Sequence, residues 1–130
     1  SMNIVMLTGN IMLANRLTVH YDRPSTFINI IIVPRVQNGV ENGYRDYIPI
    51  IAYGKLAEYL GTKTTKGTKI FIQGSIEKNV QKNKKVDFKT LGCQVRILSA
   101  KVLEGEVQNI IGEDGEIIDQ KDFILNILPL

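Results

Sequence analysis

The fold of this chain is decided by residues 44–77, YRDYIPIIAYGKLAEYLGTKTTKGTKIFIQGSIE. An apolar strand comes first, GKLAE then opens a short helix, a Lys-Gly pair makes a turn, and a second strand with an internal glycine follows. Elsewhere Ile, Val, Thr and Tyr dominate short apolar segments between turn signals, which is typical of strands. One short helix between the third and fourth strands of an all-β chain is typical of a five-stranded barrel whose open end the helix covers.

The rest of the chain supplies the other strands. Residues 37–43, QNGVENG, hold two Asn-Gly pairs, whose residues tolerate positive φ, so a loop is expected there. Pro34 is expected to stop the strand before this loop. Ile70, Ile72 and Ile76 alternate with Phe71, so the isoleucines should fill the barrel core. The expected strands are residues 3–12, 26–33, 45–53, 68–78 and 86–103, with a helix over residues 55–62 and a polar loop over residues 79–85.

Four short segments have a recognisable order and spacing: residues 3–10 (NIVMLTGN), 53–58 (YGKLAE), 66–67 (KG) and 70–74 (IFIQG). In these segments the chain resembles the bacterial single-stranded-DNA-binding protein family, over roughly the first 104 residues, with residues 15–35 matching only loosely. The resemblance implies an all-β fold, the five-stranded Greek-key barrel called the OB-fold. It also implies sequence-independent binding of single-stranded DNA in replication, recombination and repair, by a homo-oligomer that is usually a tetramer.

Charge is distributed unevenly along the chain. The formal net charge is +3, but residues 1–104 carry 15 Lys and Arg against 7 Asp and Glu, and residues 105–130 have a net charge of −5. A basic body with an acidic tail favours a nucleic-acid partner for the body and a regulatory or protein-binding role for the tail. The alternative is a solvated surface with an incidental charge gradient.

The sequence offers little for catalysis. It has no phosphate-binding loop, no nucleophile elbow and no H-E-x-x-H, and His20 stands apart from any metal-ligand partner. Cys93 is the only cysteine, so it cannot form an internal disulfide, and it is expected to pack in the core. We therefore expect no enzyme, no cofactor and no metal site. No apolar run reaches the ~18 residues of a membrane span and no signal-peptide pattern opens the chain, so a cytoplasmic, nucleoid-associated protein is expected.

Three aromatic residues are candidates for stacking on bases, which is how proteins bind single strands without reading their sequence. Tyr47 and Tyr53 are six residues apart on one strand, so both should lie on one face. Phe71 alternates with the core isoleucines and should point outward. The resemblance supports all three, because family members carry DNA-facing aromatics at these positions. The alternative for each ring is packing in the core or at a subunit interface.

Basic residues are the candidates for contacting the phosphate backbone. The hairpin over residues 78–89 carries five lysines and could wrap a strand, or could simply be a solvated loop. Phe88, at the base of this hairpin, could stack on a base or pack against the hairpin. The chain has no tryptophan, whereas many family members stack bases on several, so more of the affinity should come from charge. The predicted basic contacts are Arg35, Arg45, Lys55, Lys78, Lys82, Lys84, Lys85 and Lys89.

The last 26 residues are expected to lie outside the main domain. The domain is expected over residues 2–104, with an acidic linker and an apolar segment, FILNILPL, over residues 105–130. The family ends in an acidic tip closing on Pro-Phe that docks replication and repair proteins, and Pro129-Leu130 is similar in form. However, Asn126, Ile127 and Leu128 stand where acids are expected. The segment could instead pack as an extra strand or onto a neighbouring subunit.

Two alternatives to the single-strand-binding function are compatible with the sequence. One is a replication-restart accessory protein with the same fold. The other is an OB-fold subunit that binds other proteins and no DNA, with its aromatic residues buried in an interface.

Overall fold

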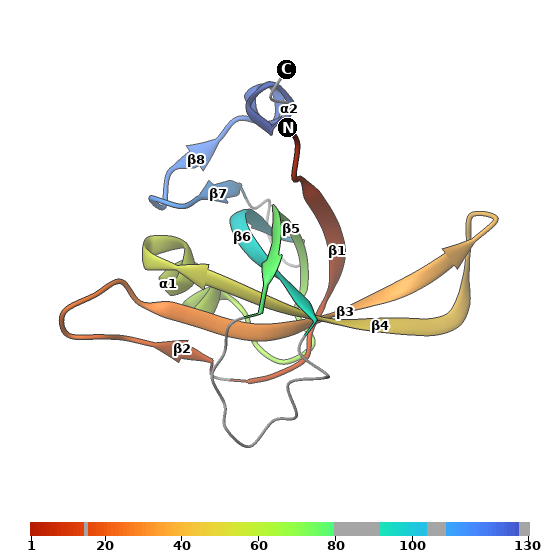
Figure 1. Cartoon of the computed structure of the whole chain (residues 1–130), viewed down its shortest axis with the longest axis horizontal. Coiled ribbons are helices and arrows are strands. Elements are labelled where there is room, and N and C mark those ends of the chain that lie inside the picture. The colour runs from red at the N-terminus through yellow and green to blue at the C-terminus, as the bar shows by residue number, and fades with distance from the viewer. Residues whose placement is uncertain (15, 80–91, 104–108, 128–130) are drawn as a thin grey trace.

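The computed structural model describes residues 1–14, 16–79, 92–103 and 109–127, with side chains as far as residue 123. Most of these residues belong to strands, and two helices follow the fourth and the last strand (Figure 1). The elements are β1 (Val5–Ile11), β2 (Leu17–Thr18), β3 (Thr26–Gln37), β4 (Val40–Tyr53), α1 (Gly54–Lys63), β5 (Lys69–Lys78), β6 (Cys93–Val102), β7 (Ile110–Gly112), β8 (Ile117–Ile118) and α2 (Gln120–Ile127).

Five strands close into a barrel. β1 pairs with β3 on one side and β5 on the other, β3 pairs with β4, and β5 pairs with β6, all antiparallel. A short parallel pairing between β4 and β6 closes the ring, with Ile50 opposite Val95. The predicted OB-fold is confirmed. Buried aliphatic side chains fill the interior, among them Ile31, Ile50, Ile72 and Ile97.

Helix α1 covers one end of the barrel, as predicted. Its buried residues, Leu56, Ala57 and Leu60, recur at the spacing of one helical face and join the barrel core. The chain turns from β4 into the helix at Gly54, whose φ of +66° is a left-handed conformation that glycine adopts without strain. The Gly54 N–H donates to the carbonyl of Ser25 at 2.8 Å, which ties this turn to the start of β3.

The internal glycine of β5 lies opposite a bulge in β6. A Cβ at Gly74 would overlap the carbonyl oxygen of Arg96 on β6, so only glycine permits this close approach. The register between β5 and β6 shifts between Gln73 and Gly74, and both residues are buried. The extra residue, Leu98, lies on β6, so the shift reverses the alternation of β6 and leaves that of β5 unchanged. The prediction that Ile76 fills the core is wrong, because its side chain, near the end of β5, is 48% exposed.

The β3–β4 hairpin is longer than the sequence suggested. Pro34 does not stop the strand, because a register irregularity between Pro34 and Val36 accommodates it and β3 continues to Gln37. The predicted loop over residues 37–43 is wrong as well. Asn38 and Gly39, with φ of +53° and +78°, make a tight turn and β4 begins at Val40. Residues 34–45 thus form an arm that extends from the barrel (Figure 1).

The C-terminal part is folded where the sequence predicted a linker. β7 extends the sheet beyond β6, and β8 pairs with β7, because isoleucines at residues 110–111 and 117–118 give this stretch strand character. The apolar segment enters a helix, α2, and does not form the extra strand considered above. Phe123 is only 7% exposed, and its ring meets the Phe71 ring edge-on with centroids 5.7 Å apart.

The single cysteine of the chain lies outside the barrel core. Cys93 is exposed at the start of β6, so the prediction that it packs in the core is wrong. Its position at the strand end places it beyond the barrel interior.

Among the described residues, no helix is long and apolar enough to cross a membrane.

Candidate nucleic-acid interface

The outward face of β3 and β4 combines two tyrosines with an aliphatic centre. Alternation along β4 puts Tyr47 and Tyr53 on this face, with Tyr47 58% and Tyr53 37% exposed. Six residues of strand separate them by about 20 Å. Between them, residues opposite one another across the two strands are apolar. We call this the tyrosine face; it consists of Ile28, Ile30 and Ile32 of β3 and Arg45, Tyr47, Pro49 and Tyr53 of β4.

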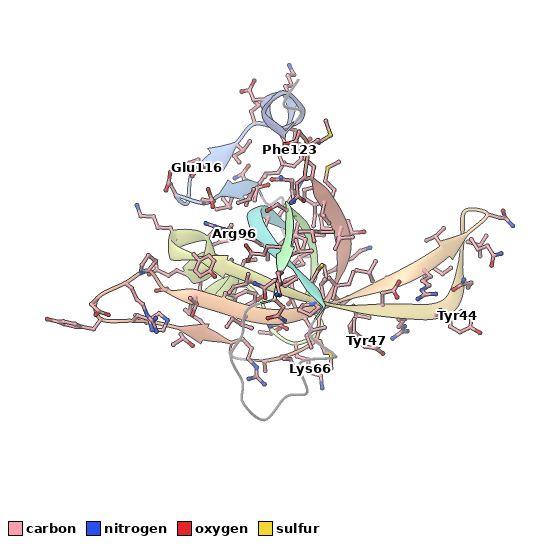
Figure 2. The ribbon with its side chains drawn as sticks, in the orientation of Figure 1. Tyr44, Tyr47, Lys66, Arg96, Glu116 and Phe123 are labelled. Atoms are coloured by element: carbon pink, nitrogen blue, oxygen red, sulfur yellow. The ribbon has the colours of Figure 1, made fainter. Side chains whose placement is uncertain are left out.

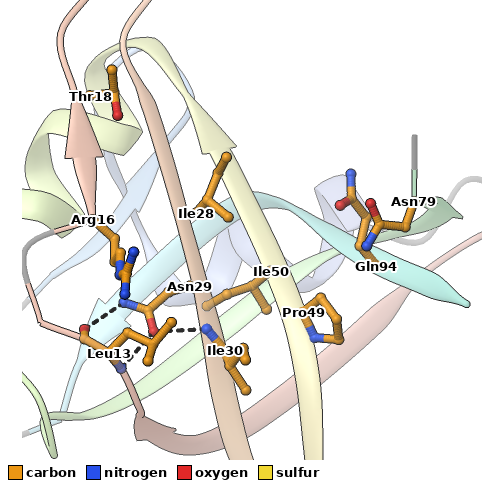
Figure 3. Close-up of a pocket in the computed structure, with 10 residues that line it drawn as sticks. All are labelled: Leu13, Arg16, Thr18, Ile28, Asn29, Ile30, Pro49, Ile50, Asn79 and Gln94. Atoms are coloured by element: carbon orange, nitrogen blue, oxygen red, sulfur yellow. Dashed lines mark hydrogen bonds between the residues drawn. The ribbon is translucent and has the colours of Figure 1, made fainter. Parts of the chain in front are cut away.

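A groove runs beside this face (Figure 3). It has a volume of about 510 Å³, and Ile28, Ile30 and Pro49 form part of its wall with Arg16 at its edge. Buried Asn29 fixes the groove floor, because its side-chain amide bonds both the N–H and the carbonyl of Leu13, at 3.0 and 2.8 Å. The groove thus presents apolar surface and a cation along β3, which suits bases and a phosphate backbone.

Tyr53 is held from one side by a cation. The guanidinium carbon of Arg96, on β6, lies 5.1 Å from the centroid of the Tyr53 ring. A terminal nitrogen of Arg96 also lies 3.5 Å from a carboxylate oxygen of Glu113, in the turn between β7 and β8. In the same turn Gly115 lies against the side chain of Lys55. The acidic turn therefore pairs with Arg96 and lies against the aliphatic part of the Lys55 side chain.

Phe71 lies on a different wall of the barrel. β5 pairs with β1 and β6, and it is not adjacent to β3 or β4. Phe123 of α2 covers the Phe71 ring. The structure therefore does not bring Phe71 together with Tyr47 and Tyr53, and its ring serves to pack the C-terminal helix.

The two predicted arginines of the arm differ in their surroundings. Arg35 makes a two-pronged ion pair with Asp46, in which Nη2 donates to one carboxylate oxygen at 2.9 Å and Nε to the other at 3.0 Å. This hydrogen-bonded pairing raises the pKa of Arg35 and lowers the pKa of Asp46. Arg45 shares the outward face of β4 with Tyr47, and in the described part of the chain it makes no ion pair. Arg45 is thus the better placed of the two to meet a phosphate.

Of the five lysines predicted for the hairpin, only Lys78 belongs to the described residues. Lys78 is exposed at the end of β5. Lys82, Lys84, Lys85, Phe88 and Lys89 lie outside the described residues, so the hairpin prediction stays a prediction.

Some residues of this surface were not singled out from the sequence. Tyr44 is 69% exposed and points to the same side of the arm as Tyr47 (Figure 2). Arg96 reaches Tyr53 through the parallel pairing of β4 and β6, which no local pattern reveals. Arg16 falls in the stretch that matches the family only loosely. Alternation along β4 is enough to assign its odd-numbered residues to the face of Tyr47. Contacts between residues of distant strands, by contrast, can be identified only from the folded structure.

The chemistry of the surface is that of binding. No group of three or more His, Cys, Asp or Glu that could hold a metal ion occurs in the described parts of the chain. The face offers aromatic rings, aliphatic side chains and cations, which together can stack bases and neutralise phosphates.

Comparison with known proteins places this surface in context. The model of the single-strand binding protein family matches residues 2–103. The N-terminal domain of the PriB protein from Thermoanaerobacter tencongensis, described as dimeric, is similar in structure, with a TM-score of 0.57 and 22% identity over 79% of this chain and 98% of that one. The SSB domain of a Synechococcus sp. protein has a TM-score of 0.57 and 14% identity, over 77% of this chain and 94% of that one. No curated protein matches.

Proposed function

Because this chain belongs to the single-strand binding protein family, we propose that it binds single-stranded DNA without sequence preference, on the tyrosine face. The observation that carries the proposal is the exposure of Tyr47 and Tyr53 on one face, about 20 Å apart along β4. Rings at this separation can stack on different bases of one strand, and stacking accepts any base. Arg16 and Arg45 flank the face and can meet phosphates between them.

The role of this binding is to protect strands that are exposed in replication, recombination and repair. The chain does so as a homo-oligomer. In support, β1 pairs with β3 only through Asn10 and Ile11 among the described residues, so the preceding half of β1 has an edge available to a second copy. Met6, on this half of β1, is 53% exposed. Light scattering coupled to gel filtration would measure the number of copies, and a monomer at micromolar concentration would contradict this part of the proposal.

Titration with fluorescent oligo-dT at low salt tests the binding itself. We expect submicromolar affinity and equal affinity for dT, dC and mixed strands within about tenfold. Duplex DNA of the same length is the control, and it should bind much more weakly because its bases are not free to stack. Absence of a response to any single strand would favour the alternative, an OB-fold subunit that binds other proteins.

A further inference from the structure

A pocket opens beside Tyr53 on the side away from Arg96. It has a volume of about 460 Å³, within the range of small-ligand sites. β4 lies between β3 and β6 in the barrel. Arg96 approaches the Tyr53 ring from β6, whereas the pocket is formed from the β3 side. Its lining residues are Thr18, His20, Arg23, Pro24, Thr26, Ile28 and Tyr53.

The loop between β2 and β3, residues 19–25, is fixed at its inner end. Ser25 is 5% exposed, its hydroxyl donates to a carboxylate oxygen of Glu58 at 3.1 Å, and its carbonyl accepts the Gly54 N–H. These contacts tie the loop to the start of α1. The loop therefore has a defined position next to Tyr53.

A chain of side-chain contacts places a guanidinium at the pocket. Nε2 of His20 lies 3.1 Å from the hydroxyl of Thr26, the residue opposite Tyr53 across the two strands. A terminal nitrogen of Arg23 lies 3.4 Å from Nδ1 of His20. Arginine can only donate hydrogen bonds, so Nδ1 of His20 accepts the bond from Arg23. In a neutral His20 ring the hydrogen is then on Nε2, which donates to the Thr26 hydroxyl. Arg23 is thereby linked to the strand that borders Tyr53.

The charge of Arg23 is not neutralised by a carboxylate. Within the described residues Arg35 and Arg96 each pair with an acid, but Arg23 makes no ion pair, even with its neighbour Asp22. A planar guanidinium with free donors matches the oxygens of a phosphate. The walls from Pro24 and Ile28 are apolar, and the Tyr53 ring offers a stacking surface.

From this geometry we propose that the pocket is a subsite for one nucleotide of the bound strand. Its base stacks on the face of Tyr53 opposite Arg96, and its phosphate is bound by Arg23. His20 positions Arg23, and Arg96 positions the ring. The subsite rests on the proposed function, since its ligand is a unit of the single strand.

Double-mutant cycles on oligo-dT affinity test the subsite. Arg23→Ala and Tyr53→Ala should each weaken binding by about fivefold or more. Together they should weaken it by less than the product of the two effects, because both act on one nucleotide. When Arg23→Ala is combined with Tyr47→Ala, the loss of affinity should equal the product of the two single fold-changes, because Tyr47 lies at the other end of the tyrosine face.

The controls separate the subsite from general charge. Lys121→Ala, on α2, removes the same charge and should change the affinity by less than about twofold. Arg23→Lys keeps the charge but loses the planar guanidinium that can donate two parallel hydrogen bonds to a phosphate. Its affinity should therefore lie between those of Arg23→Ala and the unsubstituted protein. Circular dichroism and melting temperature should match the unsubstituted protein for the Arg23 variants, because Arg23 is exposed.

Three results overturn the subsite. If the unsubstituted protein binds oligo-dT but Arg23→Ala behaves like Lys121→Ala, Arg23 binds no phosphate. If the effects of Arg23 and Tyr53 simply multiply, the two residues do not share a nucleotide. In both cases the proposed function stands. If the unsubstituted protein fails to bind any single strand, the proposed function fails and the subsite fails with it.

Discussion

The guanidinium carbon of Arg96 lies 5.1 Å from the centre of the Tyr53 ring, so a residue of β6 holds a ring of β4 on the outward face of the barrel. The contact is possible because β4 and β6 pair in parallel, with Ile51 opposite Arg96. Arg96 also meets Glu113, which connects the binding face to the acidic turn of the C-terminal hairpin. Two parts of the chain that differ in charge thus meet at one arginine.

Tyr47→Ala should weaken oligo-dT binding by about 1–3 kcal/mol, because the substitution removes one stacking ring. The side chain is 58% exposed, so folding should be unaffected and the melting temperature should stay the same. Fluorescence anisotropy and thermal melting measure the two quantities. Ile117→Ala is the control, since Ile117 is an exposed apolar side chain of β8, away from the tyrosine face. Loss of stability with Tyr47→Ala would show that the ring supports the fold instead.

Phe123→Ala should lower the free energy of unfolding by about 2–4 kcal/mol, because Phe123 is buried against Phe71. Oligo-dT affinity should hardly change, since the two rings lie away from the tyrosine face. Urea denaturation of the single and double Phe71 and Phe123 variants gives their coupling, expected at about 0.5–1.5 kcal/mol. A large loss of affinity with Phe71→Ala and no loss of stability would restore Phe71 as a base-stacking residue.

Local patterns predicted the barrel well. The order of apolar segments and the GKLAE sequence located the strands and α1, and alternation placed Tyr47 and Tyr53 on one face. The errors arose at strand ends and register irregularities, which alternation alone does not reveal. Ile76 is exposed near the end of β5, although alternation predicted it in the core, and the irregularity after Pro34 allowed β3 to continue.

The site was only partly predictable because its contacts join distant segments. Arg96 meets Tyr53 through strand pairing, and His20 meets Thr26 and Arg23 through the path of one loop. In the sequence His20 stands alone and Arg96 is one cation among many. The packing of Phe123 on Phe71 spans much of the chain and follows no local period.

Glu113→Gln should tighten oligo-dT binding by up to about fivefold at low salt, because it removes a carboxylate that competes with DNA for Arg96. Raising the salt concentration should shrink the gain, since screening weakens the exposed pair. A point substitution is preferable to deleting the C-terminal part, which would also remove β7 and uncover Phe71. Asp122→Asn, on α2, is the control with the same change in charge. Equal effects of both substitutions would mean that net charge alone, and not the contact with Arg96, governs the affinity.

Replacing Lys82, Lys84 and Lys85 by Ala should reduce the salt dependence of oligo-dT binding. Each phosphate neutralised on a single strand contributes about −0.7 to the slope of log K against log salt, so three lost contacts should make the slope shallower by about 2. The affinity should fall most at low salt, where these contacts contribute most. The affinity is measured by titration at several salt concentrations. The control replaces Lys63, Lys101 and Lys121, which removes the same charge outside residues 78–89. An unchanged slope with the first variant would make the hairpin a solvated loop, and the phosphate contacts would then belong to Arg16, Arg23 and Arg45.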